Sequence, residues 1–374
     1  MKNHKEVLQE LLEPAGVVLD GPHAWDPQIR DERIFGRIFS HGLIAVGEGY
    51  MDGSWDVADL PELIARVLRS RQARKIRAIN VIPLALSALR HRLLNLQGKR
   101  RAKEVAYRHY DIGNDLYERM LDRRMAYSCG YWKDVKDLDG AQEAKLDLIC
   151  RKIGLKQGER VLDIGCGWGS FAVFAAERYG AHVVGVTISK EQAALARERA
   201  AGLPVDIRLQ DYRDIADGPY DKIVSVGMFE HVGHKNYKTF FRLARRLLKD
   251  DGLFLLHAIG FKHTSLIADP WIDKYIFPNG ILPSAAQIAA ATDRLFVLED
   301  WHNFGADYEK TLLAWFENFE RHWPQLREKY DERFFRMWKF YLLSCAGAFR
   351  ARESQLWQIV LSPRGVSGGY TAVR

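Results

Sequence analysis

The stretch RVLDIGCGWGSFAVFAAERYG, residues 160–180, decides the fold. Its apolar and β-branched start favours a buried strand, and a helical pattern begins near its end. Between the two lie three glycines at alternate positions, Gly165, Gly167 and Gly169. Because glycine permits positive φ and leaves the backbone bare, the pattern predicts a strand, a tight ligand-binding turn and a helix N-terminus. A plain connecting turn is the alternative.

A carboxylate, Asp163, stands just before this turn. It suits a cationic amino group better than a pyrophosphate, and the glycine spacing differs from the G-x-G-x-x-G of dinucleotide sites. The pattern D-x-G-x-G-x-G resembles motif I of the S-adenosylmethionine methyltransferases. The resemblance implies a Rossmann-like class I methyltransferase fold with a seven-stranded, mostly parallel sheet. We therefore expect Asp163 and the three glycines to contact S-adenosylmethionine.

Four more strand-like segments follow the glycine turn, with helical patterns between them. They are residues 182–189, 204–214, 220–233 and 252–260. Such alternation predicts a parallel sheet with helices on both faces. In nucleotide sites an acid at the end of the second strand holds the ribose hydroxyls. Thr187 and the nearby Gln192 stand there instead, which counts against a generic adenosine site.

Composition indicates a globular protein of the reducing cytoplasm. The chain has 374 residues, a length that suggests two or three domains. Its 47% hydrophobic and 28% charged residues are typical of globular proteins. Its four cysteines show no zinc-site spacing and are too few for a disulfide scaffold, so we expect no metal. The charged N-terminus does not read as a signal peptide, and no apolar run approaches the roughly 20 residues of a membrane span.

The chain divides into three expected parts. Residues 1–80 read as a small mixed α/β domain without a catalytic constellation. Residues 81–97 form a basic, amphipathic helical linker interrupted by Pro83, and residues 98–374 form the catalytic domain.

Positive charge is concentrated around this linker. Residues 66–103 contain twelve Lys or Arg and no Asp or Glu, although the whole chain carries only +7. A basic residue near anionic lipid contributes about 1 kcal/mol. We therefore expect the N-terminal domain and linker to attach the protein peripherally to the inner face of the membrane. A solvated linker helix is the alternative; a nucleic-acid partner is not expected, because the interleaved aliphatic residues suit a bilayer better.

Motifs spread along the chain resemble one family. They include YMDGSWD (50–56), YSCGYW (127–132), GVTISKEQ (185–192), SVGMFEHVG (225–233), DPWIDKYIFPNGILPS (269–284) and CAGAFRARESQLWQIV (345–360). Together they resemble the cyclopropane-fatty-acid synthases, in particular the bacterial phospholipid-modifying branch. The resemblance implies methyl transfer to cis double bonds of phospholipid acyl chains, closure of a cyclopropane ring and a homodimer. An acyl-chain methyltransferase that forms a methyl or methylene branch is the enzymatic alternative, and a non-catalytic lipid-binding protein is the other.

Ring closure needs a base for a proton of the added methyl group. The resemblance implies that a bound bicarbonate serves, with ligands at Cys129, Glu230, His257 and Tyr308 and the backbone near Ile259. His257 and Tyr308 can donate to such an anion, and Glu230 can accept its hydroxyl proton.

Further site residues are assigned by the resemblance or by context. The cofactor side is expected to include Tyr127, Ser128, Thr187, Gln192, Gln210, Asp211 and Tyr212. Aromatic rings can exclude water and stabilise a carbocation by roughly 0.5–2 kcal/mol each, and Trp271, Phe304 and Tyr308 are among the candidates. Cys345 lies in LLSCAGAFRAR, which reads as the small-residue face of a helix. We expect a structural or pocket role for it, with a catalytic role as the alternative.

Overall fold

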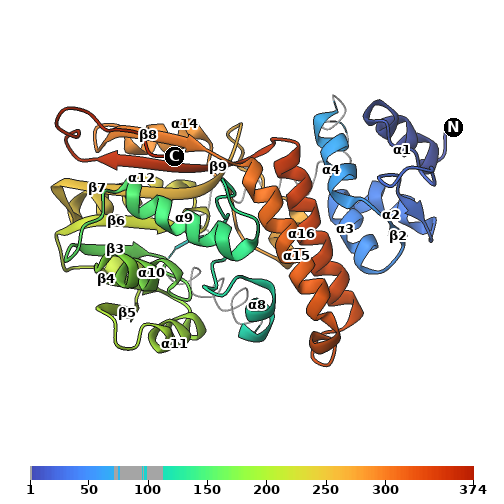
Figure 1. Cartoon of the computed structure of the whole chain (residues 1–374). Helices are drawn as coiled ribbons and strands as arrows, with labels where there is room; N and C mark the ends of the chain where they lie inside the picture. Colours follow the sequence, from blue (N-terminus) through green and yellow to red (C-terminus); the bar gives the residue numbers. More distant parts are fainter. Residues whose placement is uncertain (1, 71–74, 76–94, 96, 99–112) are drawn as a thin grey trace. The chain divides into compact units, whose positions relative to one another are not determined.

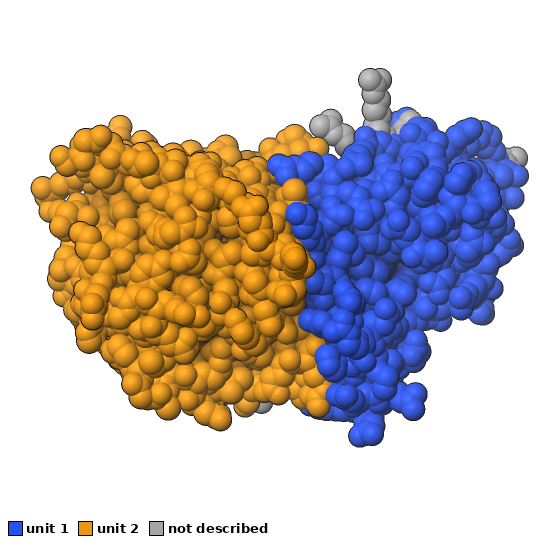
Figure 2. Space-filling view, viewed as in Figure 1, with its two compact units in different colours: residues 1–94, 266–279, 308–354 blue, residues 95–265, 280–307, 355–374 orange. Residues whose placement is uncertain are grey.

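The computed structural model describes residues 2–70, 75, 95, 97–98 and 113–374. The chain forms two compact units, which Figure 2 shows in different colours. Unit 1 comprises residues 1–94, 266–279 and 308–354, and unit 2 comprises residues 95–265, 280–307 and 355–374. The units therefore do not follow the boundaries expected near residues 80 and 98. The functional division into three parts stays a prediction, and most of the expected linker lies outside the described residues.

Unit 2 is built on a seven-stranded sheet with the order β5-β4-β3-β6-β7-β9-β8 (Figure 1). The pairs among β3 to β7 are parallel, whereas β8 and β9 pair antiparallel. This confirms the expected Rossmann-like, mostly parallel sheet. The strands are β3 (Arg160–Ile164), β4 (His182–Thr187), β5 (Val205–Leu209), β6 (Tyr220–Val226), β7 (Leu248–Phe261), β8 (Val297–Asn303) and β9 (Ser354–Ser362).

Helices cover both faces of this sheet. One face, called the α9 face below, packs against α9 (Leu138–Lys152), α10 (Ser170–Tyr179) and α11 (Lys190–Arg199). The other packs against α12 (Tyr237–Leu247) and α14 (Ala285–Thr292). Because side chains alternate along a strand, Val161 enters the first core and Leu162 the second.

The glycine turn has the expected backbone. Gly165, Gly167 and Gly169 have φ of 86°, 56° and 81°, and α10 begins directly after the third. A Cβ on Gly165 would lie 2.5 Å from Cγ of Met228, so a side chain there would be both strained and obstructed. The predicted strand, turn and helix are confirmed.

Two of the expected strands were too long. β5 ends at Leu209 and β6 at Val226, whereas the sequence pattern suggested strands to residues 214 and 233. The excess residues form short 3-10 helices, η2 (Tyr212–Asp214) and η3 (Phe229–His231), at the carboxyl ends of the strands. These turns carry several of the predicted site residues.

Unit 1 is almost entirely helical. Trp271 packs onto Gly47, where an added Cβ would lie 2.3 Å from the ring. Gly347 in α16 (Glu332–Arg350) likewise allows a close approach, since an added Cβ would lie 2.6 Å from the carbonyl oxygen of Pro61. None of the helices in the described part of the chain is long and apolar enough to cross a membrane. The elements are α1 (His4–Leu12), α2 (Arg33–His41), α3 (Leu43–Met51), α4 (Leu60–Arg69), α13 (Pro270–Tyr275), α15 (Ala306–Leu326) and α16 (Glu332–Arg350), with a short pair of strands, β1 (Gln28–Ile29) and β2 (Trp55–Asp56).

Candidate active site

A buried layer of polar side chains lies between the sheet and α9 in unit 2. Asp163, His257 and Gln358 face this side, since each lies two residues along its strand from an apolar residue of the α9 core. Helix α9 contributes Gln142 and Lys145. All five are at most 1% exposed. Buried polar groups are costly unless they are hydrogen-bonded, yet four of the five keep a nitrogen or oxygen without a partner among the described residues, all but Lys145. This layer is therefore the candidate site.

Asp163 provides an acceptor beside the glycine turn. Its Oδ2 has no hydrogen-bond partner among the described residues. Burial raises the pKa of Asp163 to about 7, although the charge of Lys145 opposes the shift. Next to it, the space around Gly167 is open, so a ligand can approach the backbone. A buried free carboxylate oxygen and a bare backbone fit the amino group and the carboxylate end of S-adenosylmethionine.

Helix α9 fixes the segment that precedes the glycine turn. Lys145 Nζ donates to Ser128 Oγ at 2.7 Å, and Gln142 Nε2, one turn earlier, donates to the Ser128 carbonyl at 2.7 Å. Burial lowers the pKa of Lys145 to about 8. Neither α9 residue was predicted from the sequence. The available signal was a charge within the apolar stripe of the helix, because Lys145 lies at helical spacing between Ala141 and Ile149.

The residues expected near the ribose and adenine gather at the ends of β4 and β5. Thr187 Oγ1 donates to Gln192 Oε1 at 2.9 Å, and the backbone of Gln210 donates to the Thr187 carbonyl at 2.9 Å. Asp211 caps η2 and pairs with the arginine two residues on at 2.6 Å. The ring of Tyr212 packs partly buried against the core of the second sheet face. The structure thus brings these residues together, and their individual roles stay predictions.

Glu230 lies in η3, just after β6. Its Oε1 accepts from the backbone N–H of Ile259 at 2.6 Å, while its Oε2 has no partner among the described residues. Burial raises the pKa of Glu230 to about 7. This carboxyl is therefore poised between its charged and neutral forms near neutral pH, as a group that exchanges protons should be.

His257 lies in β7, and its carbonyl accepts from the backbone N–H of Gly227 after β6 at 2.9 Å. Its Nδ1 is 3.3 Å from Gln358 Nε2, and its Nε2 has no partner in the described part of the chain. Burial, with the charges of Lys145 and Lys152, holds the pKa of His257 well below its ordinary value. The ring is therefore neutral and carries one hydrogen.

Cys129 follows Ser128 and is fully buried. Its Sγ donates to the Gly130 carbonyl at 3.2 Å. Phe304 supplies an aromatic wall in the same unit, since its ring centroid lies 5.9 Å from that of His257 and 5.3 Å from that of Tyr131. The nearby rings make this part of the site apolar around its few polar atoms.

Tyr308 and Cys345 belong to unit 1, whereas Cys129, Glu230 and His257 belong to unit 2. Tyr308 lies on α15, and its ring packs 4.5 Å from that of Phe349. Cys345 lies on α16, as expected for a helix face, and desolvation raises the pKa of its thiol to about 12. A thiol that resists ionisation is a poor nucleophile, which favours the structural role. The roles of both residues stay predictions.

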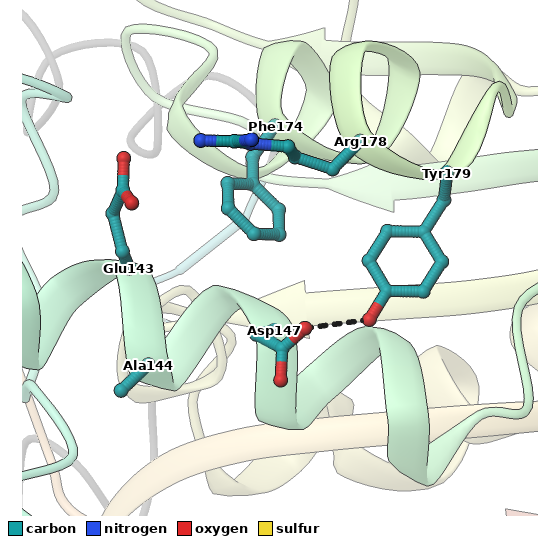
Figure 3. Close-up of a pocket in the computed structure, with 6 residues that line it drawn as sticks. All are labelled: Glu143, Ala144, Asp147, Phe174, Arg178 and Tyr179. Carbon is teal, nitrogen blue, oxygen red and sulfur yellow. Dashed lines mark hydrogen bonds between the residues drawn. The ribbon is translucent and has the colours of Figure 1, made fainter. Parts of the chain in front are cut away.

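A separate hollow lies on the surface of unit 2 between α9 and α10 (Figure 3). Tyr179 donates to Asp147 across it at 2.7 Å. None of the predicted site residues lines this hollow, whose residues are Glu143, Ala144, Asp147, Phe174, Arg178 and Tyr179. Helix α9 thus presents one polar face to this hollow and another, with Gln142 and Lys145, to the sheet.

The strand order, the glycine turn and the acid before it define a class I S-adenosylmethionine-dependent methyltransferase. The fold comparison agrees. A crystal structure of a mycolic acid cyclopropane synthase complexed with SAH and CTAB matches with a TM-score of 0.65 and 33% identity, covering 69% of this chain and 97% of that one.

Sequence comparisons identify the family. The family described as mycolic acid cyclopropane synthetase matches residues 97–359. Over 372 residues the chain is 52% identical to the cyclopropane-fatty-acyl-phospholipid synthase of Escherichia coli K12, covering 100% of this chain and 96% of that protein. It is 35% identical over 355 residues to a tuberculostearic acid methyltransferase of Mycobacterium tuberculosis, a match that covers 90% of this chain and 82% of that protein. The chain belongs to the cyclopropane synthetase family, as the sequence motifs predicted.

Proposed function

We propose that this protein methylates cis double bonds of phospholipid acyl chains with S-adenosylmethionine and closes the product to a cyclopropane ring. One observation carries the proposal. Two buried groups that can exchange or donate protons each keep an atom without a partner among the described residues: His257 in strand β7, and Glu230 in η3 just after strand β6 of the same sheet. A methyltransferase for an ordinary nucleophile needs a base before the transfer, whereas this substrate must lose its proton afterwards.

The chain's residues bind, orient and exclude water. Asp163 and the glycine turn would hold the cofactor, which supplies a methyl group on a positively charged sulfur. An alkene is a weak nucleophile, so holding it beside that methyl group is the main task, and proximity can contribute several kcal/mol. Phe304 and its neighbouring rings would keep water from the carbocation that methyl transfer leaves on the acyl chain.

We assign the base to a bicarbonate ion held by Cys129, Glu230, His257 and Tyr308, with the backbone at Ile259. The buried unpartnered atoms of Glu230 and His257 support this assignment, because such atoms are rare in proteins unless something else satisfies them. Bicarbonate would supply an oxygen base for a proton of the bridging methyl. The test is single-turnover ring formation in buffer freed of carbon dioxide, with bicarbonate then restored. A rate unchanged by its removal would contradict the assignment.

The overall activity is tested on vesicles with cis-unsaturated phospholipids, incubated with the protein and S-adenosylmethionine. Mass spectrometry should show the gain of one CH₂ unit, and proton NMR should show cyclopropane ring protons. A methyl or methylene branch would instead support the second candidate, which the identity to a tuberculostearic acid methyltransferase keeps in view. With cofactor binding shown and several lipids tried, absence of product would favour a lipid-binding protein.

Attachment to the inner membrane face is the third part of the proposal. It rests on the basic stretch at residues 66–103, much of which lies outside the described residues. Neutralising Lys99, Arg100, Arg101 and Lys103 to Gln should weaken binding to anionic vesicles several-fold and leave binding to neutral vesicles unchanged. The control neutralises four exposed arginines elsewhere, Arg33, Arg294, Arg321 and Arg364. Equal loss in both variants would refute a specific attachment site.

A homodimer is also part of the proposal, and analytical sedimentation of the purified protein tests it.

A further inference from the structure

We propose that Gln358 is a positioning residue for His257. Its side-chain NH₂ donates to Nδ1 of the ring and so places the ring's single hydrogen on Nε2, from which it is donated into the site. This inference deepens the proposed function, since it states which His257 atom faces the anionic base and in which role. Nothing in the sequence motifs singled out Gln358 for such a task.

The geometry joins two side chains that belong to neighbouring strands. β9 lies beside β7 in the sheet, and both residues face α9. Gln358 Nε2 lies 3.3 Å from His257 Nδ1, and the two residues are 0% and 1% exposed. Water therefore does not compete for this contact. The ring's other nitrogen, Nε2, and the amide oxygen of Gln358 have no partner among the described residues.

A neutral imidazole has one donor and one acceptor nitrogen, and the partner of one nitrogen decides the role of the other. If the amide nitrogen of Gln358 donates to Nδ1, then Nε2 must carry the hydrogen. If the amide were reversed, Nδ1 would donate and Nε2 would present a lone pair. The direction of the hydrogen bond at Nδ1 therefore decides whether Nε2 is a donor or an acceptor.

The chemistry of the site selects the first arrangement. Glu230 already offers carboxyl oxygens in this region, and the base we assign is an anion that needs donors. A lone pair on Nε2 would face that anion with a second acceptor, whereas an N–H would bind it. Protonating both nitrogens is not an alternative, because burial and the charges of Lys145 and Lys152 keep the ring neutral.

The tautomer of the His257 ring can be measured by NMR without any catalytic reaction. Protein labelled with ¹⁵N in its histidine rings is examined by long-range proton–nitrogen NMR, and His257→Gln identifies the signals of His257 by their loss. We expect a protonated Nε2 and an unprotonated Nδ1 in the unaltered protein. A protonated Nδ1 would overturn the inference, whatever the activity. Absence of a cyclopropane product would instead refute the proposed function and leave the tautomer assignment intact.

Substitutions at residue 358 test the causal link. Gln358→Glu keeps the size, and at a pH where its carboxyl is ionised it can only accept. It should then move the hydrogen to Nδ1 and lower the rate of ring formation about 10–100-fold, with cofactor affinity unchanged. Gln358→Met should leave a mixture of tautomers and a smaller loss. An unchanged tautomer in a folded Gln358→Glu protein would overturn the role of Gln358.

Gln355→Glu is the matched control on the same strand. Gln355 lies three residues earlier on β9, so alternation turns it to the other sheet face. Its Oε1 already accepts from Asn303 Nδ2 at 2.7 Å, and a glutamate can keep that acceptor role. This variant adds the same charge to β9 and should leave the His257 tautomer unchanged. A changed tautomer here would mean that the charge alone moves the hydrogen, which would overturn the inference.

Discussion

Lys145 and Lys152 lie two turns apart on α9, and both are buried, yet their surroundings differ. Lys152 Nζ lies 3.3 Å from Asp300 Oδ2, and Arg374 binds the same carboxylate at 2.6 and 2.7 Å. Lys145 forms no ion pair with any described residue, and its hydrogen bond goes to the neutral Ser128 Oγ. Burial lowers the pKa of both lysines to about 8.

The difference in partners distinguishes a lysine that stabilises the fold from a lysine that belongs to the candidate site. A buried cation is expensive, and a carboxylate in direct contact is the usual compensation. Lys152 has that compensation within the protein, so no ligand is needed to explain it. Lys145 acts at longer range on the carboxylate of Asp122, then on Cys129 and Asp163, and the last two are predicted site residues. We therefore interpret Lys145 as the positive charge of the active site and Lys152 as part of the scaffold.

The largest expected effect is that of Lys145→Met. Removing the cation raises the pKa of Asp163 further, so the carboxylate that would bind the cofactor is neutralised more readily. It also removes one of the two α9 side-chain bonds to Ser128, and the bond from Gln142 remains. We expect cofactor affinity to fall about tenfold, or on the order of 1.4 kcal/mol, by calorimetry, and ring formation to fall further. Stability should be unchanged or higher, because a desolvated charge is gone. Unchanged cofactor affinity in this variant would show that Lys145 is not part of the active site.

Lys152→Met should behave in the opposite way. Asp300 keeps Arg374 but loses a buried donor, so the free energy of unfolding should drop by about 1–3 kcal/mol in urea titrations. Cofactor affinity should stay within twofold of the original. A variant that binds poorly but unfolds normally would reverse the comparison.

The pH dependence of stability sharpens the comparison at Asp163. Its pKa rises from 3.8 in the unfolded chain to about 7 in the folded protein, so the folded form binds the proton more strongly. This contribution to stability is present below pH 4 and is lost as pH rises to about 7. Asp163→Asn should flatten that part of the profile, measured by urea unfolding at several pH values. Cofactor binding should show the reverse trend and weaken below pH 7, as the carboxylate is neutralised.

The smallest effect is expected from Cys345→Ser. Cys345 is also a desolvated titratable residue, but it belongs to unit 1, whereas both lysines belong to unit 2. Its thiol stays protonated, since its pKa is raised to about 12. The variant should keep at least half of the ring-forming activity in the vesicle assay. Near-total loss in a folded protein would make Cys345 catalytic.

Local features of the fold could be predicted from the sequence. The strand, turn and helix of residues 160–180 depend on periodicity and on glycine φ, which neighbouring residues determine. The family motifs also led to Glu230 and His257, whose catalytic roles stay predictions. By contrast, the bond from Lys145 to Ser128 depends on how α9 lies against the sheet, and that from Gln358 to His257 joins residues 101 apart in the sequence. No periodicity encodes such pairs, and none revealed that unit 1 draws on three separate segments.

That discontinuity has a consequence for synthesis on the ribosome. Helix α4 packs along α16, and Arg350 binds Glu62 across 288 residues of chain. At about 5–20 residues per second, α4 waits roughly 15–60 seconds for its partner to be made. Throughout that interval α4 lacks its cover from α16 and has only N-terminal neighbours such as η1 (Glu13–Ala15), while the sheet of unit 2 is being translated. We therefore expect the apolar face of α4 to be a binding site for chaperones during synthesis.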